Sequence, residues 1–233
     1  MNIKPPFFEI GPKSYLYGDD ILELALAADK ASKKYGVDII FTTPVVDIRR
    51  VAQETERLHV FAPHMDPIYP GRGLADILPE SLVAAGAEGV MLNHTEKPLS
   101  YEVLSETVKR AKEVGLTTIV CADSAREAAS IARLKPDIIV AEPSELIGTG
   151  VSVGEEYVAA AMDAVHNVDS DILVLTAAGI AGGQDVFDVI AAGADATGSS
   201  SGVAKAEDRA AMVDEMISAV RRAWDMRYPE GGK

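Results

Sequence analysis

Short apolar runs alternate with longer amphipathic stretches along almost the whole chain. Turn-forming residues bound the runs, whereas the stretches between them repeat apolar residues at helical spacing. This alternation is typical of repeated βα units that build a parallel sheet. The apolar runs predict eight strands, at residues 7–11, 38–42, 59–62, 89–92, 117–121, 137–141, 172–176 and 194–199.

The amphipathic stretches predict the helices that connect these strands. Glycine follows several of the stretches directly, at a position where a left-handed helix C-cap favours it: Gly36, Gly86, Gly115 and Gly193. Clear examples of predicted helices are residues 21–35, 101–114, 125–133, 156–166, 185–192 and 207–224.

Eight βα units leave no room for a second domain. We therefore predict an α/β protein with one domain over residues 1–233, a closed (β/α)₈ barrel, for which this length is ordinary. The rival fold is an open doubly wound sheet. Its first strand would be expected to lead into a glycine-rich phosphate loop, and Gly11-Pro12-Lys13 is not one.

Composition and charge favour small-molecule chemistry. The hydrophobic content of 48% and charged content of 25% are those of a globular protein. A formal net charge of −14 repels nucleic acid and anionic membrane surfaces at long range, so neither is an expected partner. No apolar run approaches the roughly 18–20 residues of a membrane span, and no secretion signal is evident, so we expect a cytoplasmic protein.

Polar side chains follow several predicted strands, at the end of a barrel where active sites lie. Lys13 follows the first strand, His94 the fourth and Glu142 the sixth. Proton abstraction next to a carbonyl needs a carboxylate base, a hydrogen-bond donor and a fixed positive charge, and these side chains supply all three. Singly, each fits an ordinary structural role, but their shared position favours a site. Thr95 is a fair helix N-cap, and the N–H groups of a helix start there would keep the His94 ring neutral.

Two kinds of loop complete the predicted site. Residues 142–150 combine a carboxylate, a proline and glycines, which fits a hinged lid, although an ordinary ordered loop is the alternative. Residues 177–183 and 198–202 are rich in glycine, alanine and serine and follow the last two strands, where barrels of this kind bind phosphate through backbone N–H groups.

No cofactor is expected. No two histidines or cysteines share ligand spacing, so we predict no metal site. The glycines at 179, 182 and 183 come too late in the chain for a dinucleotide loop. The lone cysteine, Cys121, ends an apolar run and is expected to be a buried structural thiol.

Two of these segments, in this order along the chain, resemble the triosephosphate isomerase family, especially its short archaeal type. Residues 91–97 (Met-Leu-Asn-His-Thr-Glu-Lys) resemble the turn that carries the catalytic histidine. Residues 141–150 (Ala-Glu-Pro-Ser-Glu-Leu-Ile-Gly-Thr-Gly) resemble the lid that begins with the catalytic glutamate. The resemblance extends over about residues 7–206 and implies a TIM barrel.

The resemblance implies a role for each residue. Glu142 would be the base, His94 the neutral electrophile and Lys13 the electrostatic clamp, paired with Glu96. It also implies a homodimer or homotetramer in which the loop at 63–76 reaches a neighbouring subunit. The residues expected to bind the sugar phosphate are Gly11, Lys13, Gly148, Gly179, Ser200, Ser201 and Gly202.

The chain departs from the family pattern at several places. Gly11 stands where the family has asparagine, and Leu74 is aligned with a threonine that crosses the subunit interface. Ala177 replaces a glycine and Pro63 a glutamine. The loss of two polar donors at 11 and 74 is expected to open space, so we hypothesise that a longer or differently substituted sugar phosphate is preferred to the triose pair. Restoring both donors should then raise triose activity more than either change alone.

Several functions fit these features. The first is interconversion of glyceraldehyde 3-phosphate and dihydroxyacetone phosphate, or the same reaction on a related four-carbon ketose phosphate. The second is a lyase or decarboxylase that works through an enediolate. The third is a non-catalytic phosphosugar-binding protein, which the presence of Glu142, His94 and Lys13 together disfavours.

Overall fold

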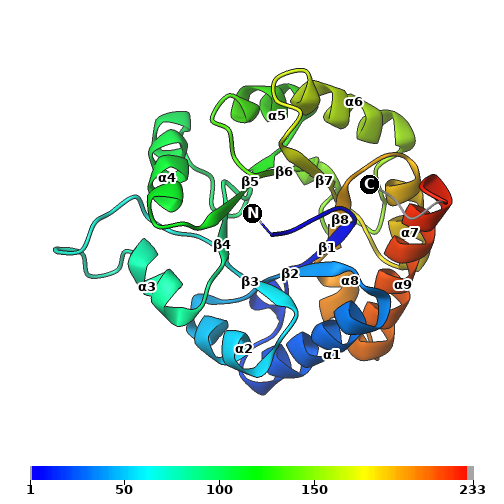
Figure 1. Ribbon diagram of the computed structural model, residues 1–233, viewed down its shortest axis with the longest axis horizontal. Coiled ribbons are helices and arrows are strands. Elements are labelled where there is room, and N and C mark those ends of the chain that lie inside the picture. The colour runs from blue at the N-terminus through cyan, green and yellow to red at the C-terminus, as the bar shows by residue number, and fades with distance from the viewer. Residues whose placement is uncertain (1, 230–233) are drawn as a thin grey trace.

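Eight parallel strands form a closed barrel in the computed structural model, which describes residues 2–229 (Figure 1). Each strand pairs with the next in sequence, and β8 closes the barrel on β1 through the register Glu9 with Gly198. The predicted barrel is therefore confirmed. The strands are β1 (Phe7–Ile10), β2 (Asp38–Thr42), β3 (Leu58–Ala62), β4 (Gly89–Leu92), β5 (Thr117–Ala122), β6 (Ile138–Ala141), β7 (Leu173–Thr176) and β8 (Ala196–Ser199).

Helices surround the barrel as an outer ring (Figure 1). Within residues 2–229, no helix has the length and apolar character needed to cross a membrane. Short 3₁₀ turns are η1 (Lys13–Tyr15), η2 (Val45–Asp47) and η3 (Ser144–Leu146). The helices are α1 (Asp19–Tyr35), α2 (Ile48–Glu54), α3 (Pro79–Ala85), α4 (Tyr101–Glu113), α5 (Ala125–Ala132), α6 (Glu155–His166), α7 (Gly183–Ala191), α8 (Ser201–Ala204) and α9 (Arg209–Arg227).

Most element boundaries match the sequence prediction to within one or two residues. The four glycines predicted as C-caps all have positive φ, between 62° at Gly36 and 125° at Gly193. The last helix begins two residues later than predicted because Asp208 caps it, accepting a hydrogen bond from the N–H of Ala211 at 2.9 Å. The predicted single domain over 1–233 includes residues 1 and 230–233, which lie outside the described residues.

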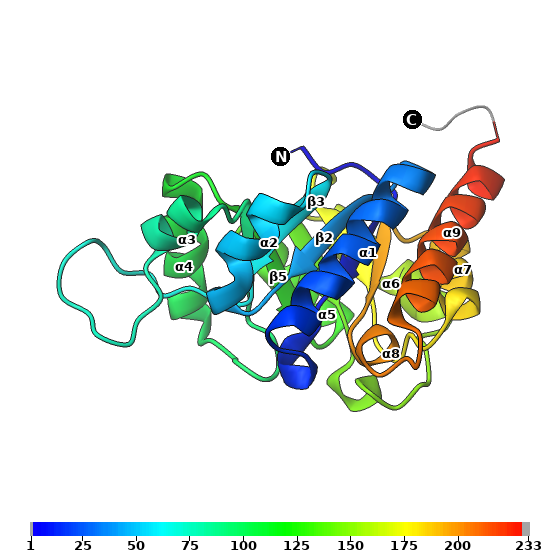
Figure 2. The ribbon, with the colours of Figure 1, turned by 90° about the horizontal axis from the view of Figure 1, so that it is seen from below.

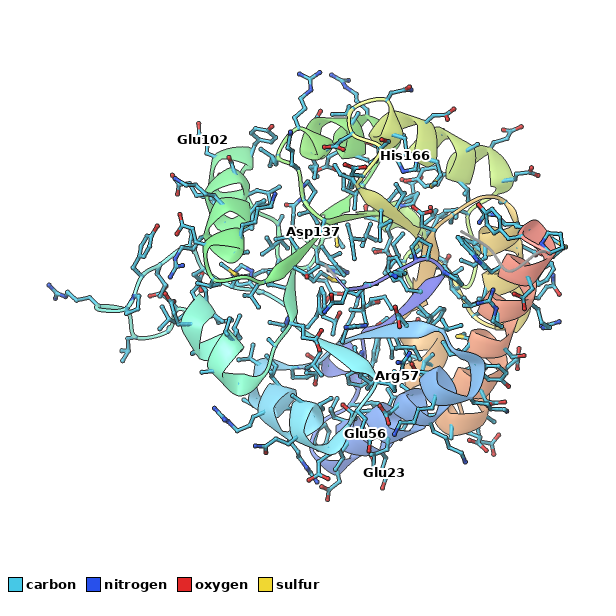
Figure 3. All side chains as sticks on the ribbon, in the orientation of Figure 1. Glu23, Glu56, Arg57, Glu102, Asp137 and His166 are labelled. Atoms are coloured by element: carbon cyan, nitrogen blue, oxygen red, sulfur yellow. The ribbon has the colours of Figure 1, made fainter. Side chains whose placement is uncertain are left out.

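Two apolar layers hold the fold together. One fills the barrel interior, where Phe7, Phe61 and Ile119 are fully buried. The other lies between the sheet and the helices and includes Phe8 and Phe41. Figure 3 shows the complementary outer surface, on which charged side chains such as Glu23, Glu56 and Glu102 lie at the periphery.

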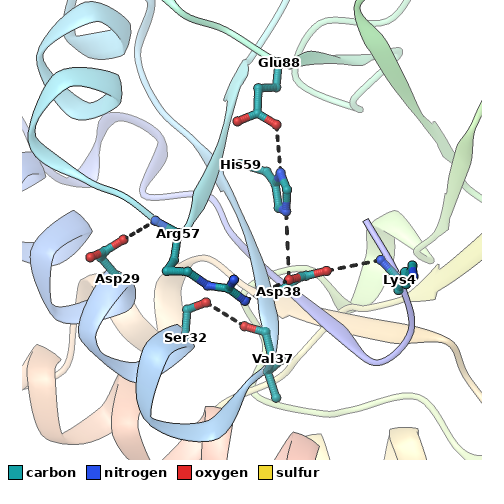
Figure 4. A network of polar contacts seen from close by, with 8 residues as sticks. All are labelled: Lys4, Asp29, Ser32, Val37, Asp38, Arg57, His59 and Glu88. Atoms are coloured by element: carbon teal, nitrogen blue, oxygen red, sulfur yellow. Dashed lines mark hydrogen bonds and ion pairs between the residues drawn. The ribbon is translucent and has the colours of Figure 1, made fainter. Parts of the chain in front are cut away.

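A polar network ties the N-terminal strand ends together (Figure 4). His59 Nδ1 lies 2.8 Å from a carboxylate oxygen of Glu88, and its Nε2 lies 4.0 Å from Asp38. The Lys4 N–H also donates to Asp38, at 3.2 Å. In a barrel this end serves stability rather than chemistry.

The loop between β3 and α3 extends away from the barrel in both views (Figures 1 and 2). Its base is anchored by Arg110, whose Nε donates to the Ile68 carbonyl at 2.9 Å and whose guanidinium stacks 4.2 Å from the Tyr69 ring centre. Leu74, which belongs to this loop, is fully exposed. The N-terminal segment before β1 lies at one end of the barrel and α8 at the other (Figure 2).

Candidate active site

A cavity of about 660 Å³ opens at the C-terminal ends of the strands. This volume lies within the range of roughly 300–1,000 Å³ that is usual for small-molecule sites. All residues that the sequence predicted for the site border this cavity. They are Gly11, Lys13, His94, Glu96, Glu142, Gly148, Gly179, Ser200, Ser201 and Gly202.

Lys13 lies in the 3₁₀ turn directly after β1, with a positive φ of 49°. Its Nζ lies 2.9 Å from Oε1 of Glu96, so the predicted ion pair is present. The hydrogen bond from Lys13 holds the pKa of Glu96 below its ordinary value. This pair fixes the position of the Lys13 ammonium group beside the cavity.

His94 lies in a turn that follows β4. The predicted helix start at Thr95 is wrong: the Lys97 N–H donates to the His94 carbonyl at 2.7 Å, and the next helix begins only at Tyr101. The turn nevertheless provides a backbone donor, because the Glu96 N–H donates to Nδ1 of His94 at 3.1 Å. Burial lowers the pKa of His94, with the charge of Lys13 adding to the effect and Glu96 opposing it. Burial and the charge of Lys13 both favour the neutral ring.

Asn93 holds this turn in place, a role that the sequence analysis missed. Its backbone is left-handed, with φ of 58°, which asparagine tolerates better than most residues. Its side-chain amide donates to the Cys121 carbonyl at 3.0 Å, and its oxygen accepts from the Leu99 N–H at 3.0 Å. Asparagine directly before a candidate histidine is the sequence signal that could have identified it.

Glu142 follows β6 and extends the strand pairing, since its N–H donates to the Ala122 carbonyl at 2.9 Å. Its side chain borders the cavity. Burial raises the pKa of Glu142; the charge of Lys13 opposes this rise and that of Glu96 adds to it. A buried carboxylate with a raised pKa is a stronger proton acceptor than an exposed one.

The segment after Glu142 is exposed in its middle and held at its start. The Ser144 N–H donates to Asp123 at 2.6 Å. Gly148 and Gly150 have φ of 73° and 74°. The far side of the segment packs on the β7 loop, where a Cβ on Gly179 would lie 1.9 Å from the Val151 carbonyl oxygen. Glycine at 179 therefore permits the contact between these two loops.

The loops after β7 and β8 form another side of the cavity with small residues. A Cβ on Gly202 would lie 2.5 Å from the Ile180 carbonyl oxygen, so the two loops touch through backbone. The Ser199 hydroxyl donates to the same carbonyl at 2.9 Å. Within residues 2–229, the buried hydroxyl of Ser200 has no hydrogen-bond partner. This side can present an unpaired hydroxyl and backbone to an anion.

Glu9 also borders the cavity, and the sequence analysis missed it. The residue is only 8% exposed and sits on β1 below Gly11. A Cβ on Gly11 would lie 3.0 Å from Oε1 of Glu9. The open space predicted beside Gly11 is therefore occupied by a carboxyl group. The sequence signal was an acidic residue inside the apolar run Phe-Phe-Glu-Ile.

Two further histidines have partners of their own. His64 borders the cavity and contacts Asp66 at 3.3 Å, whereas His166, at the end of α6, contacts the Ile172 carbonyl at 3.2 Å. Burial raises the pKa of the Cys121 thiol well above its usual range, which fits a structural thiol. Among residues 2–229, no cluster of three or more His, Cys, Asp or Glu side chains is arranged to hold a metal ion.

The family model described as "Triosephosphate isomerase" matches residues 13–216. The chain belongs to the triosephosphate isomerase family. It is 38% identical over 226 residues to a triosephosphate isomerase of Saccharolobus solfataricus, covering 95% of this chain and 99% of that protein. It is 36% identical over 229 residues to one of Sulfolobus acidocaldarius, covering 97% and 99%.

A more distant member of the triosephosphate isomerase family shares the fold. The crystal structure of triosephosphate isomerase from Bartonella henselae superposes with a TM-score of 0.75 at 17% identity, covering 94% of this chain and 100% of that one. The two motif segments, 91–97 and 141–150, lie within the residues matched to the family. Glu9 and Gly11 precede the start of that match.

Proposed function

We propose that this single-domain barrel isomerises short sugar phosphates of the triose type, interconverting glyceraldehyde 3-phosphate and dihydroxyacetone phosphate through an enediolate. One observation carries the proposal: Glu142, His94 and Lys13 border the same cavity, each with the environment that its role needs. Glu142 is a carboxylate with a raised pKa, His94 is a neutral donor and Lys13 carries a held positive charge.

In the proposed mechanism, Glu142 takes the proton from the carbon next to the carbonyl. The Nε2–H of His94 donates to the oxygens of the reacting carbons as negative charge develops, and Lys13 stabilises that charge. Glu142 then returns the proton to the neighbouring carbon. The reaction moves one proton between carbons and one between oxygens. It needs no external oxidant or reductant, so we propose no cofactor and no metal.

We propose that the phosphate binds at the loops after β7 and β8. Ser200, Ser201 and Gly202 would offer N–H groups and the unpaired Ser200 hydroxyl. Gly148 in the segment after Glu142 and Gly179 opposite it would close over the substrate. Such closure would exclude water and protect the enediolate.

The test is Glu142→Gln, which keeps the size of the side chain and removes the base. We expect turnover to fall by about 10²- to 10⁴-fold. The direct readout is solvent deuterium incorporation at the carbon next to the carbonyl of dihydroxyacetone phosphate. Glu156→Gln, an exposed glutamate in the first turn of α6, is the matched control. Exchange at the wild-type rate in Glu142→Gln would exclude this base. Carbon–carbon cleavage or loss of carbon dioxide in the wild type would point to the lyase class.

We also propose that the chain forms a homodimer or homotetramer and acts in the cytoplasm. The extended loop between β3 and α3 supports an oligomer, because it exposes Tyr69 and Leu74 away from the barrel. Light scattering during size-exclusion chromatography would measure the mass. A monomer at micromolar concentration would refute this part of the proposal.

A further inference from the structure

The carboxyl group of Glu9 has a definite place in the wall of the cavity. Phe7, two residues earlier on β1, lies in the barrel interior, so Glu9 faces the same side. Gly198 on β8 pairs with Glu9, and a Cβ there would lie 3.1 Å from Oε2 of Glu9. A Cβ on Gly11 would lie 3.0 Å from Oε1. A larger side chain at either glycine would displace the carboxyl group from the cavity that it borders.

Thr42 holds this carboxyl group from the neighbouring strand. It ends β2, borders the cavity, and donates a hydrogen bond from its hydroxyl to the Glu9 carboxylate. A hydrogen bond to the ionised form lowers the pKa of a carboxyl group, so Thr42 opposes the effect of burial on Glu9. Thr42 therefore orients Glu9 and also influences how readily Glu9 loses its proton.

Two charged groups on the same cavity act on Glu9. Burial raises the pKa of Glu9 most, the charge of Glu142 adds to the rise, and that of Lys13 opposes it. From β8 the facing residue is Gly198, which carries no charge. Cys121 on β5 is a buried thiol whose own pKa is raised, in part by Glu9, so it is neutral as well.

Glu9 and Glu142 form a pair of carboxyl groups that lose their protons in a fixed order. Lys13 is the main charge that stabilises ionised Glu142, whereas it is the weakest influence on Glu9. Repulsion between two carboxylates falls on the group that ionises second, and here the charge of Glu142 acts on Glu9. Glu142 therefore ionises first, while Glu9 still holds its proton. Two carboxyl groups in such different states can serve as base and as neutral donor.

We propose that Glu9, in its neutral form, donates a hydrogen bond to an oxygen of the two reacting carbons and so joins His94 and Lys13 in stabilising the enediolate. This inference rests on the proposed isomerase function and adds a catalytic residue to the same site. Glu9 keeps its proton throughout, and the proton transfer between carbons remains with Glu142.

Ionisation of Glu9 would remove this contribution. A neutral carboxylic acid has one O–H donor, whereas a carboxylate only accepts. The carboxylate would also place a negative charge beside an anionic substrate and repel it. Activity should therefore be confined to a pH window, above the protonation of Glu142 and below the ionisation of Glu9.

The first test is the pH dependence of kcat/KM for glyceraldehyde 3-phosphate, which reports groups of the free enzyme. Because the pKa of Glu9 is about 7, kcat/KM of the wild type should fall by about tenfold between pH 6 and pH 8. Glu9→Gln keeps a neutral donor that cannot ionise, so its kcat/KM relative to the wild type should rise by the same factor. Titration of the substrate phosphate cancels in this ratio.

Thr42→Val tests the same group without altering it. The variant loses the hydrogen bond that lowers the pKa of Glu9, so the alkaline loss of activity should move to higher pH. Thr43→Val is the matched control, because Thr43 is also buried but is not among the described residues that border the cavity. It should leave the alkaline limb in place. Thr42→Val also keeps the test decisive if the Glu9 variants do not fold.

Glu9→Leu removes the donor and keeps an apolar side chain of similar size. We expect its kcat at pH 6 to fall by about 10²-fold, with a smaller change in KM, because the donor acts on charge that develops in the transition state. Glu9→Gln should lose clearly less. Three results would each overturn the inference: unchanged kcat in Glu9→Leu, an equal loss in both variants, or wild-type activity that does not fall between pH 6 and pH 8.

Binding of 2-phosphoglycolate separates this inference from the proposed function. The ligand cannot be isomerised and carries a carboxylate in place of the reacting carbons, so titration calorimetry detects the donor without turnover. Between pH 6 and pH 8, the affinity of the wild type should fall by about tenfold relative to that of Glu9→Gln. If it does so while the wild type fails to isomerise triose phosphates, the proposed function is wrong and the Glu9 donor stands. If Glu142→Gln abolishes turnover but the affinity ratio is constant, the base stands and the donor is wrong.

Discussion

The backbone N–H of Glu96 donates a hydrogen bond to Nδ1 of His94 at 3.1 Å. A ring nitrogen that accepts this bond carries no proton, so the proton of the neutral imidazole is on Nε2. The same Glu96 binds Lys13 through its side chain at 2.9 Å. One residue therefore sets the tautomer of the histidine and the position of the lysine.

This arrangement predicts the effect of His94→Gln. We expect kcat to fall by about 10²-fold and KM to change little, because the imidazole acts on charge that develops mainly in the transition state. Steady-state kinetics with the preferred substrate measure the two constants. A large rise in KM at unchanged kcat would instead assign His94 to substrate binding.

The pH profile gives an independent check on His94. Burial raises the pKa of Glu142, and under the proposed mechanism this group must be ionised to act as the base, so we expect the loss of activity toward acid pH to report its protonation. His94→Gln should therefore keep this acid limb at the same pH. Disappearance of the limb would mean that the histidine, and not the glutamate, titrates there.

Lys13→Met should damage both kcat and KM. The ammonium group attracts the anionic substrate and also stabilises the enediolate, so we expect kcat/KM to fall by roughly 10²-fold or more. The control is Lys34→Met, which removes the surface pair with Asp214, at 2.7 Å, far from the cavity. Unchanged kinetics in Lys13→Met would place the end of β1 outside the site.

The raised pKa of Glu9 predicts that the stability of the fold depends on pH. Burial raises its pKa from an ordinary 4.5 to about 7, against the opposing effect of the Thr42 hydroxyl, and the charge of Glu142 adds to the rise. Between these values the folded chain holds a proton that the unfolded chain has lost. The free energy of unfolding should thus decrease as pH rises from about 4.5 through 7, by up to roughly 3 kcal/mol.

Glu9→Gln removes this contribution. Urea unfolding at pH 5, 6, 7 and 8 should show the variant gaining stability relative to the wild type as pH rises. Other titrating groups are common to both proteins and cancel in the difference. Glu23→Gln, an exposed glutamate on α1, should follow the wild type at every pH. A difference that stays constant with pH would show that Glu9 titrates normally.

Much of this protein could be predicted from local sequence because the signals are local. A strand that is buried on both faces needs a short apolar run, and a helix that ends in a left-handed residue favours glycine. Strand β2 and the caps at Gly36 and Gly86 follow from these rules alone. The candidate residues Lys13, His94 and Glu142 could be found because parallel strands bring their carboxyl ends to one side.

The structure differs from the sequence prediction where contacts between segments that are far apart along the chain determine the local geometry. Glu9 looked like part of a strand, and only the pairing of β1 with β8 places Gly198 against it and brings its carboxyl group into the cavity. The turn at His94 depends on Asn93, which bonds to Cys121 on the neighbouring strand β5. The sequence by itself determined the barrel, the order of its strands and the candidate residues at the strand ends, because periodicity and turn residues act over a few positions. Closure of the barrel decided which polar groups share the cavity, because it brings together side chains that are far apart along the chain.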